Sequence, residues 1–448
     1  MRRSIGTTLL LVGFAATAPA QQPATPGPPM LPTPAEAQGW FAPTTPDQAR
    51  DFLAALREAH PGVTVDTLAL IPGDPVTPDS ALPVHLVTVG PAGPSDRDPG
   101  QTPAPERVRV LVLAAQRGDD FAGFEVSLRM MRDLAEGVLP GLLDGMEVAF
   151  VPAANPWGLL WWVREEPSGI DPARDHSTLR SRAMRAVHDF ATAWRPQLVV
   201  ELRDLGPAVY RIQAGLPVHP NVDPELSQYG RFYLMPYVAN ELAKVSITFR
   251  EEVAAVPEVD DREPLIRGAE SLPPGGFFTP GPLGADRARN HFALAGSLGL
   301  MLGVAALDGP EGLGSRTEMQ YLALKALLEV TAHRSEGLRE RSAAASTPPG
   351  LSGSDGEEQS SGALALRSRF ETDSRNAKLT WLVWSQHGTV MRQTTEHWRS
   401  VVRRELVLPL PAAWVIERDA TAWVDLARAH GFVVECLSRP ARVEVGAY

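Results

Sequence analysis

The sequence has a single cysteine, Cys436, among its 448 residues. An internal disulfide needs two cysteines, so the fold must depend on its hydrophobic core. Long apolar runs are also scarce, and the apolar stretch near the N-terminus, Thr8–Ala16, is too short to span a membrane. Basic residues are fewer than acidic ones: the chain has 42 Lys and Arg, 53 Asp and Glu, and a net charge of −11. A chain this acidic is a poor candidate for binding nucleic acid.

Residues 1–20 have the features of a secretory signal peptide. Met1-Arg2-Arg3 is a basic start, a short apolar centre follows, and Ala18-Pro19-Ala20 offers the small residues that signal peptidase requires. No cysteine directly follows Ala20, so a lipid anchor is not indicated. We therefore expect a secreted, periplasmic protein whose net charge, without Arg2 and Arg3, falls from −11 to about −13.

Composition divides the rest of the chain into four parts. Residues 21–36 are a Pro-rich leader, and residues 342–362 are a linker rich in Ser, Gly, Pro and Glu with too little apolar content to pack. Residues 37–341 are long enough for one large domain. Residues 363–448 are expected to form a small αβ module, with a helix over Asp419–Ala429 and strands at Trp414–Ile416, Phe432–Leu437 and Val443–Val445.

Short apolar runs separated by helical patterns predict an α/β fold with a largely parallel sheet. In such a sheet, ligands lie beyond the carboxyl ends of the strands. The predicted core strands are Val110–Ala115, Glu147–Val151, Leu198–Val200 and Leu298–Leu302. The predicted helices between and after them are Phe124–Glu136, Ser181–Trp194 and Glu318–Thr331.

Five motifs follow these strands in a fixed order. They are Gln116-Arg117-Gly118-Asp119-Asp120-Phe121-Ala122-Gly123, Asn155-Pro156-Trp157-Gly158, Arg164, Asp171-Pro172-Ala173-Arg174-Asp175 and Glu201-Leu202-Arg203-Asp204. The zinc carboxypeptidases of the carboxypeptidase A type, bacterial secreted branch, have similar motifs: Gln-His-Gly-Asn-Glu-Pro-Ala-Gly, Asn-Pro-Asp-Gly, Arg, Asp-Leu-Asn-Arg-Asp and Asp-Leu-His-Glu. The chain resembles this family, and the resemblance implies a mixed, mostly parallel eight-stranded sheet flanked by helices, followed by the C-terminal αβ module.

The resemblance also shows which catalytic residues are missing. Family members bind zinc through two His and one Glu, and a further Glu is the general base. The corresponding positions here are Arg117, Asp120 and Arg203 for the metal and Gly303 for the base. A guanidinium has no lone pair to offer a metal. We therefore expect no zinc cofactor there and interpret the chain as a pseudoenzyme. The alternative is an active metallocarboxypeptidase, hydrolysing peptides, with a rebuilt metal site.

The substrate-holding positions are better kept. Arg164 matches the arginine that polarises the scissile carbonyl, and Arg174 matches the one that binds the substrate carboxylate. Asn155 also falls at a substrate-binding position, and Ala173 replaces the family's Asn. With Arg117 and Arg203, these residues allow two interpretations. They form either an anion pocket for a peptide C-terminus or another carboxylate, or a structural ion-pair network in a filled cleft. The latter would suit a structural or partner-binding protein.

The remaining candidates lack a supporting pattern. His176 lies near the proposed cleft, whereas His219, His291 and His387 have no ligand-like spacing and are expected to be structural. Trp157, Trp161 and Trp162 suit either a ligand cleft or a packed core.

Overall fold

The computed structural model describes most of the chain from residue 30 to residue 437. The described ranges are 30–73, 81–90, 107–206, 208–256, 266–267, 276–306, 311–346, 363–375, 378–384, 390–410, 413–417 and 419–437. The expected signal peptide, most of the expected leader and linker, and His387 lie outside these ranges. The domain boundaries given above therefore stay predictions.

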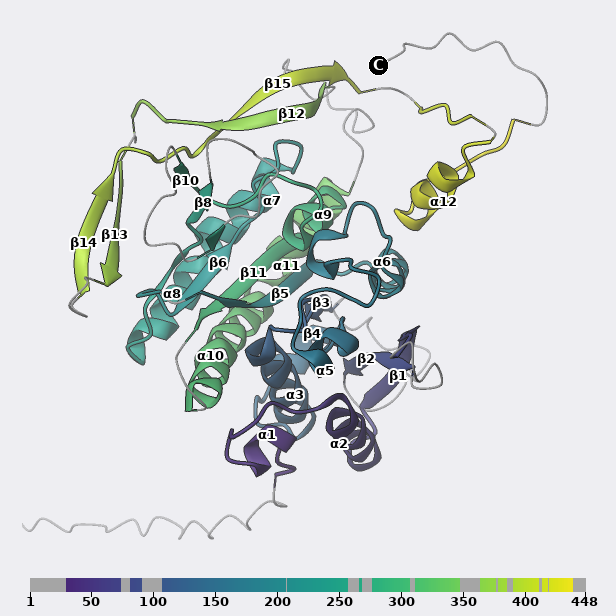
Figure 1. Cartoon of the computed structure of the whole chain (residues 1–448), viewed down its shortest axis with the longest axis vertical. Coiled ribbons are helices and arrows are strands. Elements are labelled where there is room, and N and C mark those ends of the chain that lie inside the picture. The colour runs from purple at the N-terminus through teal and green to yellow at the C-terminus, as the bar shows by residue number, and fades with distance from the viewer. Residues whose placement is uncertain are drawn as a thin grey trace, which may run out of the picture. The chain divides into compact units, whose positions relative to one another are not determined.

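A mixed eight-stranded sheet forms the centre of the fold (Figure 1). Its strands, in spatial order, are β1 (Val63–Ile71), β2 (Leu82–Val89), β4 (Met146–Val151), β3 (Val108–Leu113), β5 (Leu198–Leu205), β11 (Leu298–Ala305), β6 (Ile212–Gly215) and β7 (Phe249–Glu251). The pairs from β4 through β3 and β5 to β11 are parallel, as is β6 with β7, and the other three pairs are antiparallel. This arrangement confirms the predicted fold class.

The central strands are apolar because both faces of the sheet are covered. All eight residues of β11 are buried, and so are Val110 to Leu113 in β3. On one face, α3 (Phe121–Ala135) packs against β5, and Gly123 contacts Leu202. On this side α3 also packs against α10 (Glu311–His333). The opposite face packs against α6 (Arg182–Trp194) and α9 (Ala288–Leu294). The sheet therefore lies between two layers of helices, and three of these helices, α3, α6 and α10, form at the predicted segments.

The sequence patterns located these helices well. The helix predicted over residues 124–136 is α3, and the one predicted over 318–331 is α10, which starts earlier. The helix α6 begins directly after Ser181, whose hydroxyl accepts a hydrogen bond from the Met184 N–H at 3.2 Å. Such a cap satisfies a backbone donor in the first helical turn. The strand predicted at Leu298 is β11.

Shorter elements complete the large domain. They are α1 (Pro34–Ala37), α2 (Pro46–Ala59), α4 (Leu142–Gly145), α5 (Pro156–Trp161), the 3₁₀ turn η1 (Pro172–Arg174), α7 (Pro224–Tyr229), the π-helical turn η2 (Gly230–Leu234), α8 (Met235–Lys244) and α11 (Ser335–Ala345). A small sheet consists of β10 (Phe277–Thr279), β8 (Ala254–Val256) and β9 (Ile266–Arg267). Within the described ranges, every helix is too short or too polar to cross a bilayer.

The C-terminal region contains two hairpin-like pairs and one helix. β12 (Ala363–Glu371) pairs with β15 (Val401–Pro409), and β13 (Leu379–Trp384) pairs with β14 (Val390–Thr395). The helix α12 (Thr421–Ala429) confirms the predicted helix. The strands predicted at residues 414–416 and 432–437 are wrong, because these runs have no strand partner among the described residues and most of their side chains are exposed, Val433 by 89%. Residues 443–445 lie outside the described ranges.

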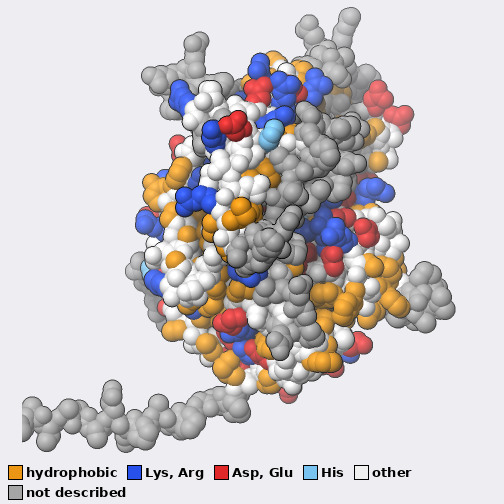
Figure 2. Space-filling view, turned by 60° about the vertical axis from the view of Figure 1, so that its left-hand side comes forward, with side chains coloured by type: hydrophobic (Ala, Val, Ile, Leu, Met, Phe, Trp, Pro, Cys, Tyr) orange, Lys and Arg blue, Asp and Glu red, His pale blue; other side chains and the backbone are white. Residues whose placement is uncertain are grey.

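The C-terminal residues make specific contacts with the large domain. The Asn221 side chain exchanges two hydrogen bonds of 2.9 Å with the backbone of Ala365. Leu426 and Ala429 of α12 pack into the hydrophobic core that includes Val187 of α6. On the face of the molecule shown in Figure 2, basic and acidic side chains are interspersed. The expectation that the chain does not bind nucleic acid stays a prediction.

Candidate functional site

The site predicted from the motifs lies where β3 and β5 end. The loop after β3 carries residues 116–120 and packs directly on α5. A Cβ atom added at Gly118 would lie 1.8 Å from the carbonyl carbon of Gly158, so the glycine at position 118 allows the two backbones to touch. The sequence therefore fixes the loop against the Asn155-Pro156 turn, and this contact brings two of the five motifs together.

Arg203 is the buried centre of the site. Its side chain is 1% exposed, its Nε lies 2.7 Å from Asp120 Oδ2, and its Nη1 lies 2.7 Å from Glu201 Oε1. The second oxygen of Asp120 accepts a hydrogen bond of 3.0 Å from the Asp204 N–H. Burial lowers the pKa of Arg203, but the charges of Asp120 and Glu201 outweigh it and raise the pKa above its usual range. The guanidinium is therefore a permanent cation that holds two carboxylates.

An open cleft of about 570 Å³ lies over this network. Aromatic side chains contribute to its wall, including Phe121 and Trp162, whose rings meet edge to face at 4.9 Å. Trp162 is 63% exposed, so its ring is available to a ligand. The other residues that line the cleft are Trp40, Phe41, Pro43, Arg117, Asp119, Asp120, Arg164, Asp204, Leu205, Gly206, Ala306, Leu313 and Arg316.

The cleft arginines are each paired with an acid. Arg117 lies 2.8 Å from Asp171, and Arg164 lies 2.9 Å from Asp119. Burial, assisted by the charge of Asp120, raises the pKa of Asp204 to about 7. Because Arg164 is 56% exposed at the cleft and Arg117 only 13%, Arg164 is the arginine that an incoming ligand can reach.

Other predicted residues occupy different places. Arg174 lies outside the described lining of the cleft, with its Nε 3.7 Å from Asp286, and Ala173 is buried beside it in η1. Asn155 is a buried helix cap: its Oδ1 accepts from the Gly158 N–H at 2.8 Å, and its Nδ2 donates to the Arg164 carbonyl at 3.0 Å. Asn155 therefore positions the backbone of Arg164. Whether these residues bind substrate stays a prediction.

Gly303 lies next to Arg203 in the parallel register of β11 and β5. A Cβ atom added at Gly303 would lie 2.5 Å from a methyl carbon of Leu205. Leu205 therefore fills the space at the position that the resemblance gives to a general base.

The residues at the zinc positions of the resembled family do not fit a metal ion. Arg117 and Arg203 offer only donors, and both oxygens of Asp120 are already engaged by Arg203 and the Asp204 N–H. A dication beside the buried Arg203 would also meet a fixed positive charge. We therefore derive no chemistry from a metal at these positions.

A second cluster, of histidines, was missed by the sequence patterns. His188, His291 and His430 come together, and one ring nitrogen of each lies within 4.8 Å of the others. His291, which has no ligand-like spacing in the sequence, is not isolated, because distant segments meet around it; its expected structural role stays a prediction. His176 is hydrogen-bonded to His188 at 3.0 Å, whereas His219 accepts a bond from the Asn221 N–H. No spacing in the sequence could reveal this cluster, because its members lie on α6, on α9 and after α12.

Burial sets the charge state of these rings. It lowers the pKa of His176 and His219 to about 4 and that of His291 to about 3. Burial lowers the pKa of His188 well below its usual value, and the charges of the neighbouring histidines act in the same direction. These imidazoles are therefore neutral near pH 7, which is the form that binds metals.

The chain is similar to known carboxypeptidases. Probable carboxypeptidase 2 of Arthroderma benhamiae is 26% identical over 106 residues, which are 23% of this chain and 20% of that protein. Carboxypeptidase 2 of Trichophyton tonsurans is 24% identical over the same length. The match thus spans about a fifth of the length of these curated relatives. No protein-family model matches the chain.

Solved structures with a similar backbone fold include carboxypeptidases. A metallo-carboxypeptidase from Burkholderia cenocepacia is 17% identical, with a TM-score of 0.48 over 66% of this chain and 71% of that one. A metallo-carboxypeptidase from Pseudomonas aeruginosa, in complex with (2-guanidinoethylmercapto)succinic acid, is 16% identical, with a TM-score of 0.45 over 67% and 71%. The curated proteins that match are carboxypeptidases, as the motifs predicted.

Proposed function

We propose that this chain is a secreted carboxypeptidase-like protein that binds peptide C-termini in its cleft without hydrolysing them. The observation that supports the loss of hydrolysis is the buried ion pair between Arg203 and Asp120, at 2.7 Å, in the position of two family zinc ligands. The loss of the general base at Gly303, where Leu205 fills the space, points the same way. Without a metal-bound water or a base, the proposed site lacks a means to attack a peptide bond.

The cleft still has the features of a binding site. Arg164 is half exposed there, and its guanidinium can form charge-assisted hydrogen bonds with a carboxylate. Phe121 and Trp162 beside it offer apolar area to the last side chain of a peptide. Asp119 competes for Arg164, so the carboxylate must replace or share an existing ion pair. We therefore expect weak to moderate affinity and a preference for aromatic or aliphatic C-terminal residues.

Peptide pairs test this proposal. A short peptide ending in Phe with a free carboxylate is titrated against its amidated twin, with binding followed by calorimetry. We expect the free acid to bind about ten-fold tighter, because one charge-assisted hydrogen bond contributes about 1.5–3 kcal/mol and 1.4 kcal/mol is a factor of ten. Arg164→Ala should remove this preference.

Arg50 offers a matched control. It is exposed to a similar degree, 53%, and pairs with Asp47 at 2.7 Å on α2. Arg50→Ala should therefore leave peptide binding unchanged. Equal affinity of the acid and the amide would contradict the binding role and favour a filled, structural cleft. Chelator-sensitive release of the C-terminal residue would instead support an active metallopeptidase with a rebuilt site.

A further inference from the structure

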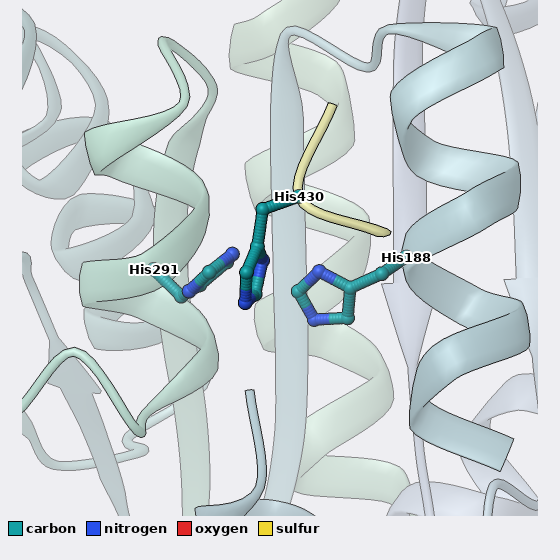
Figure 3. Close-up of side chains that lie close together, drawn as sticks. All are labelled: His188, His291 and His430. Carbon is teal, nitrogen blue, oxygen red and sulfur yellow. The ribbon is translucent and has the colours of Figure 1, made fainter. Parts of the chain in front are cut away.

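Three histidine rings from separate parts of the fold face one another (Figure 3). His188 lies on α6, His291 lies on α9, and His430 follows α12 near the C-terminus. The ring centroids of His188 and His291 are 4.6 Å apart, and those of His291 and His430 are 4.9 Å apart. One nitrogen of each ring lies within 4.8 Å of the other two. Packing of neutral rings does not by itself require nitrogens to converge in this way.

The hydrogen bonds of His188 determine which of its nitrogens carries the proton. The oxygen Oε1 of Gln116 can only accept, so the His176 Nε2, 2.6 Å away, must donate to it. His176 Nδ1 is then an acceptor, and the His188 Nε2, 3.0 Å away, donates to it. This chain leaves His188 Nδ1 unprotonated, with a lone pair available for a ligand.

The other two rings are oriented in the same manner. His430 Nε2 lies 3.0 Å from the Ser177 carbonyl and donates to it, which leaves Nδ1 unprotonated. That Nδ1 is buried and has no hydrogen-bond partner among the described residues. A ring nitrogen of His291 is hydrogen-bonded to the backbone of Ala285. Each ring therefore uses one nitrogen as a donor to the protein, as metal-binding histidines do.

We propose that His188, His291 and His430 bind a divalent transition-metal ion of the zinc type, at a site separate from Arg117, Asp120 and Arg203. The buried Nδ1 of His430 has no hydrogen-bond donor among the described residues, which is unfavourable unless a cation or water satisfies it. Zinc accepts three imidazoles and leaves a fourth position for water or another ligand. Imidazole nitrogens also suit copper, cobalt and nickel, so the three histidines select a class of transition-metal ions and not a single element.

The spacing of the rings allows such an ion after a small adjustment. Nitrogens that each lie about 2.1 Å from one tetrahedral ion are about 3.4 Å from each other. The rings must therefore approach by roughly 1 Å. His291 and His430 are only partly buried, which leaves their side chains freer to adjust than that of His188.

Bound metal would connect the C-terminal segment to the large domain. His430 directly follows α12, which packs on α6 through Leu426 and Ala429. The contact area there is small, since most side chains of α12 are exposed. A metal held by α6, α9 and residue 430 therefore acts as a clamp that keeps the end of the chain in place.

Metal titration of the untagged, mature protein tests this site. The protein is stripped with a chelator, and zinc is then added and followed by calorimetry and by metal analysis after dialysis. We expect one zinc per chain and a higher melting temperature with zinc than without. Cobalt(II) should give the visible absorption bands of a low-coordinate nitrogen site, and X-ray absorption should show nitrogen at about 2.0–2.1 Å.

Two variants locate the ion. His430→Ala removes one of the three proposed ligands from a partly buried position, and should weaken zinc binding about ten-fold or more. His397→Ala, which changes an exposed histidine outside the cluster, is the matched control and should retain the ion. The circular dichroism spectrum verifies that both variants fold. Absence of zinc binding in the unchanged protein, or unchanged affinity in His430→Ala, would overturn the proposal. Neither result depends on peptide binding in the cleft.

Discussion

Arg203 Nε lies 2.7 Å from Asp120 Oδ2, and both residues occupy positions that the family resemblance gives to zinc ligands. The pair is almost completely buried, with side chains 1% and 3% exposed. Glu201 adds a second carboxylate at 2.7 Å from the same guanidinium. The guanidinium of Arg203 thus neutralises the two buried acids beside it.

Arg203→Met should strongly destabilise the fold. The methionine keeps much of the apolar volume but leaves Asp120 and Glu201 buried without their cation. Removing one partner of a buried pair costs about 3–5 kcal/mol. The exposed pair of Arg50 with Asp47 gives the comparison, because Arg50→Met should cost less than about 1 kcal/mol. Urea unfolding followed by circular dichroism measures both values. Similar losses in the two variants would show that the buried network contributes little.

The sequence was sufficient for the parts of the site that follow strands. Glu201-Leu202-Arg203-Asp204 lies on β5, and alternation along the strand places Glu201 and Arg203 on one face. The motif residues after β3 lie beside them because β3 and β5 are parallel neighbours. The family resemblance, together with the predicted strand ends, thus placed Arg117 and Asp120 near Arg203.

Other features depended on partners that no local pattern indicates. The side chain of Arg174 turns towards Asp286, and that acid lies in a segment with no motif of its own. The histidine cluster requires α6, α9 and the C-terminal segment to meet, which packing alone decides. The apolar runs at 414–416 and 432–437 have the composition of strands, but a strand needs a partner for its backbone groups and these find none among the described residues.

Glu125 should make stability depend on pH. It is buried in α3 and accepts hydrogen bonds from the N–H and hydroxyl of Thr44 at 2.6 and 2.9 Å. Burial raises its pKa from 4.5 to about 7, against the effect of those bonds. The folded state therefore holds a proton that the unfolded state has lost between these two values.

The sign of the effect follows from that proton. The contribution of Glu125 to the free energy of unfolding should be highest below pH 4.5. It should fall as the pH rises to about 7 and stay constant above that value. One proton gives a slope of up to about 1.4 kcal/mol per pH unit. Urea unfolding of the protein and of Glu125→Gln across this range isolates the contribution, because Gln cannot ionise. Parallel profiles of the two proteins would refute the prediction.

Restoring zinc-dependent hydrolysis should require more than restoring the metal ligands of the family. Arg117→His, Asp120→Glu and Arg203→His together should permit zinc binding at the site, measured by metal analysis in a His430→Ala background. Turnover also requires a base, and Gly303→Glu places it where Leu205 now lies, 2.5 Å from the added Cβ. We therefore expect chelator-sensitive peptide hydrolysis only when Leu205→Ala is added. Hydrolysis by the triple variant alone would contradict this reading of Gly303 and Leu205.

Gly118→Ala should disturb the cleft through a backbone clash. The added Cβ would lie 1.8 Å from the carbonyl carbon of Gly158 and 2.3 Å from the amide nitrogen of Leu159. Neither backbone can move without displacing α5, which leads into Trp162 at the cleft wall. We expect a loss of about 3 kcal/mol or more in the free energy of unfolding, in the range of severe overpacking.

Gly90 provides the control for this substitution. It follows β2, and a Cβ added there meets nothing within 4 Å, so Gly90→Ala should change stability by less than about 1 kcal/mol. Urea unfolding gives the two losses, and the tryptophan fluorescence of the folded variants reports whether the cleft wall has moved. If Gly118→Ala were as stable as Gly90→Ala, the loop after β3 would not rest on α5. The close approach that brings Arg117 and Asp119 to Arg164 would then need another explanation.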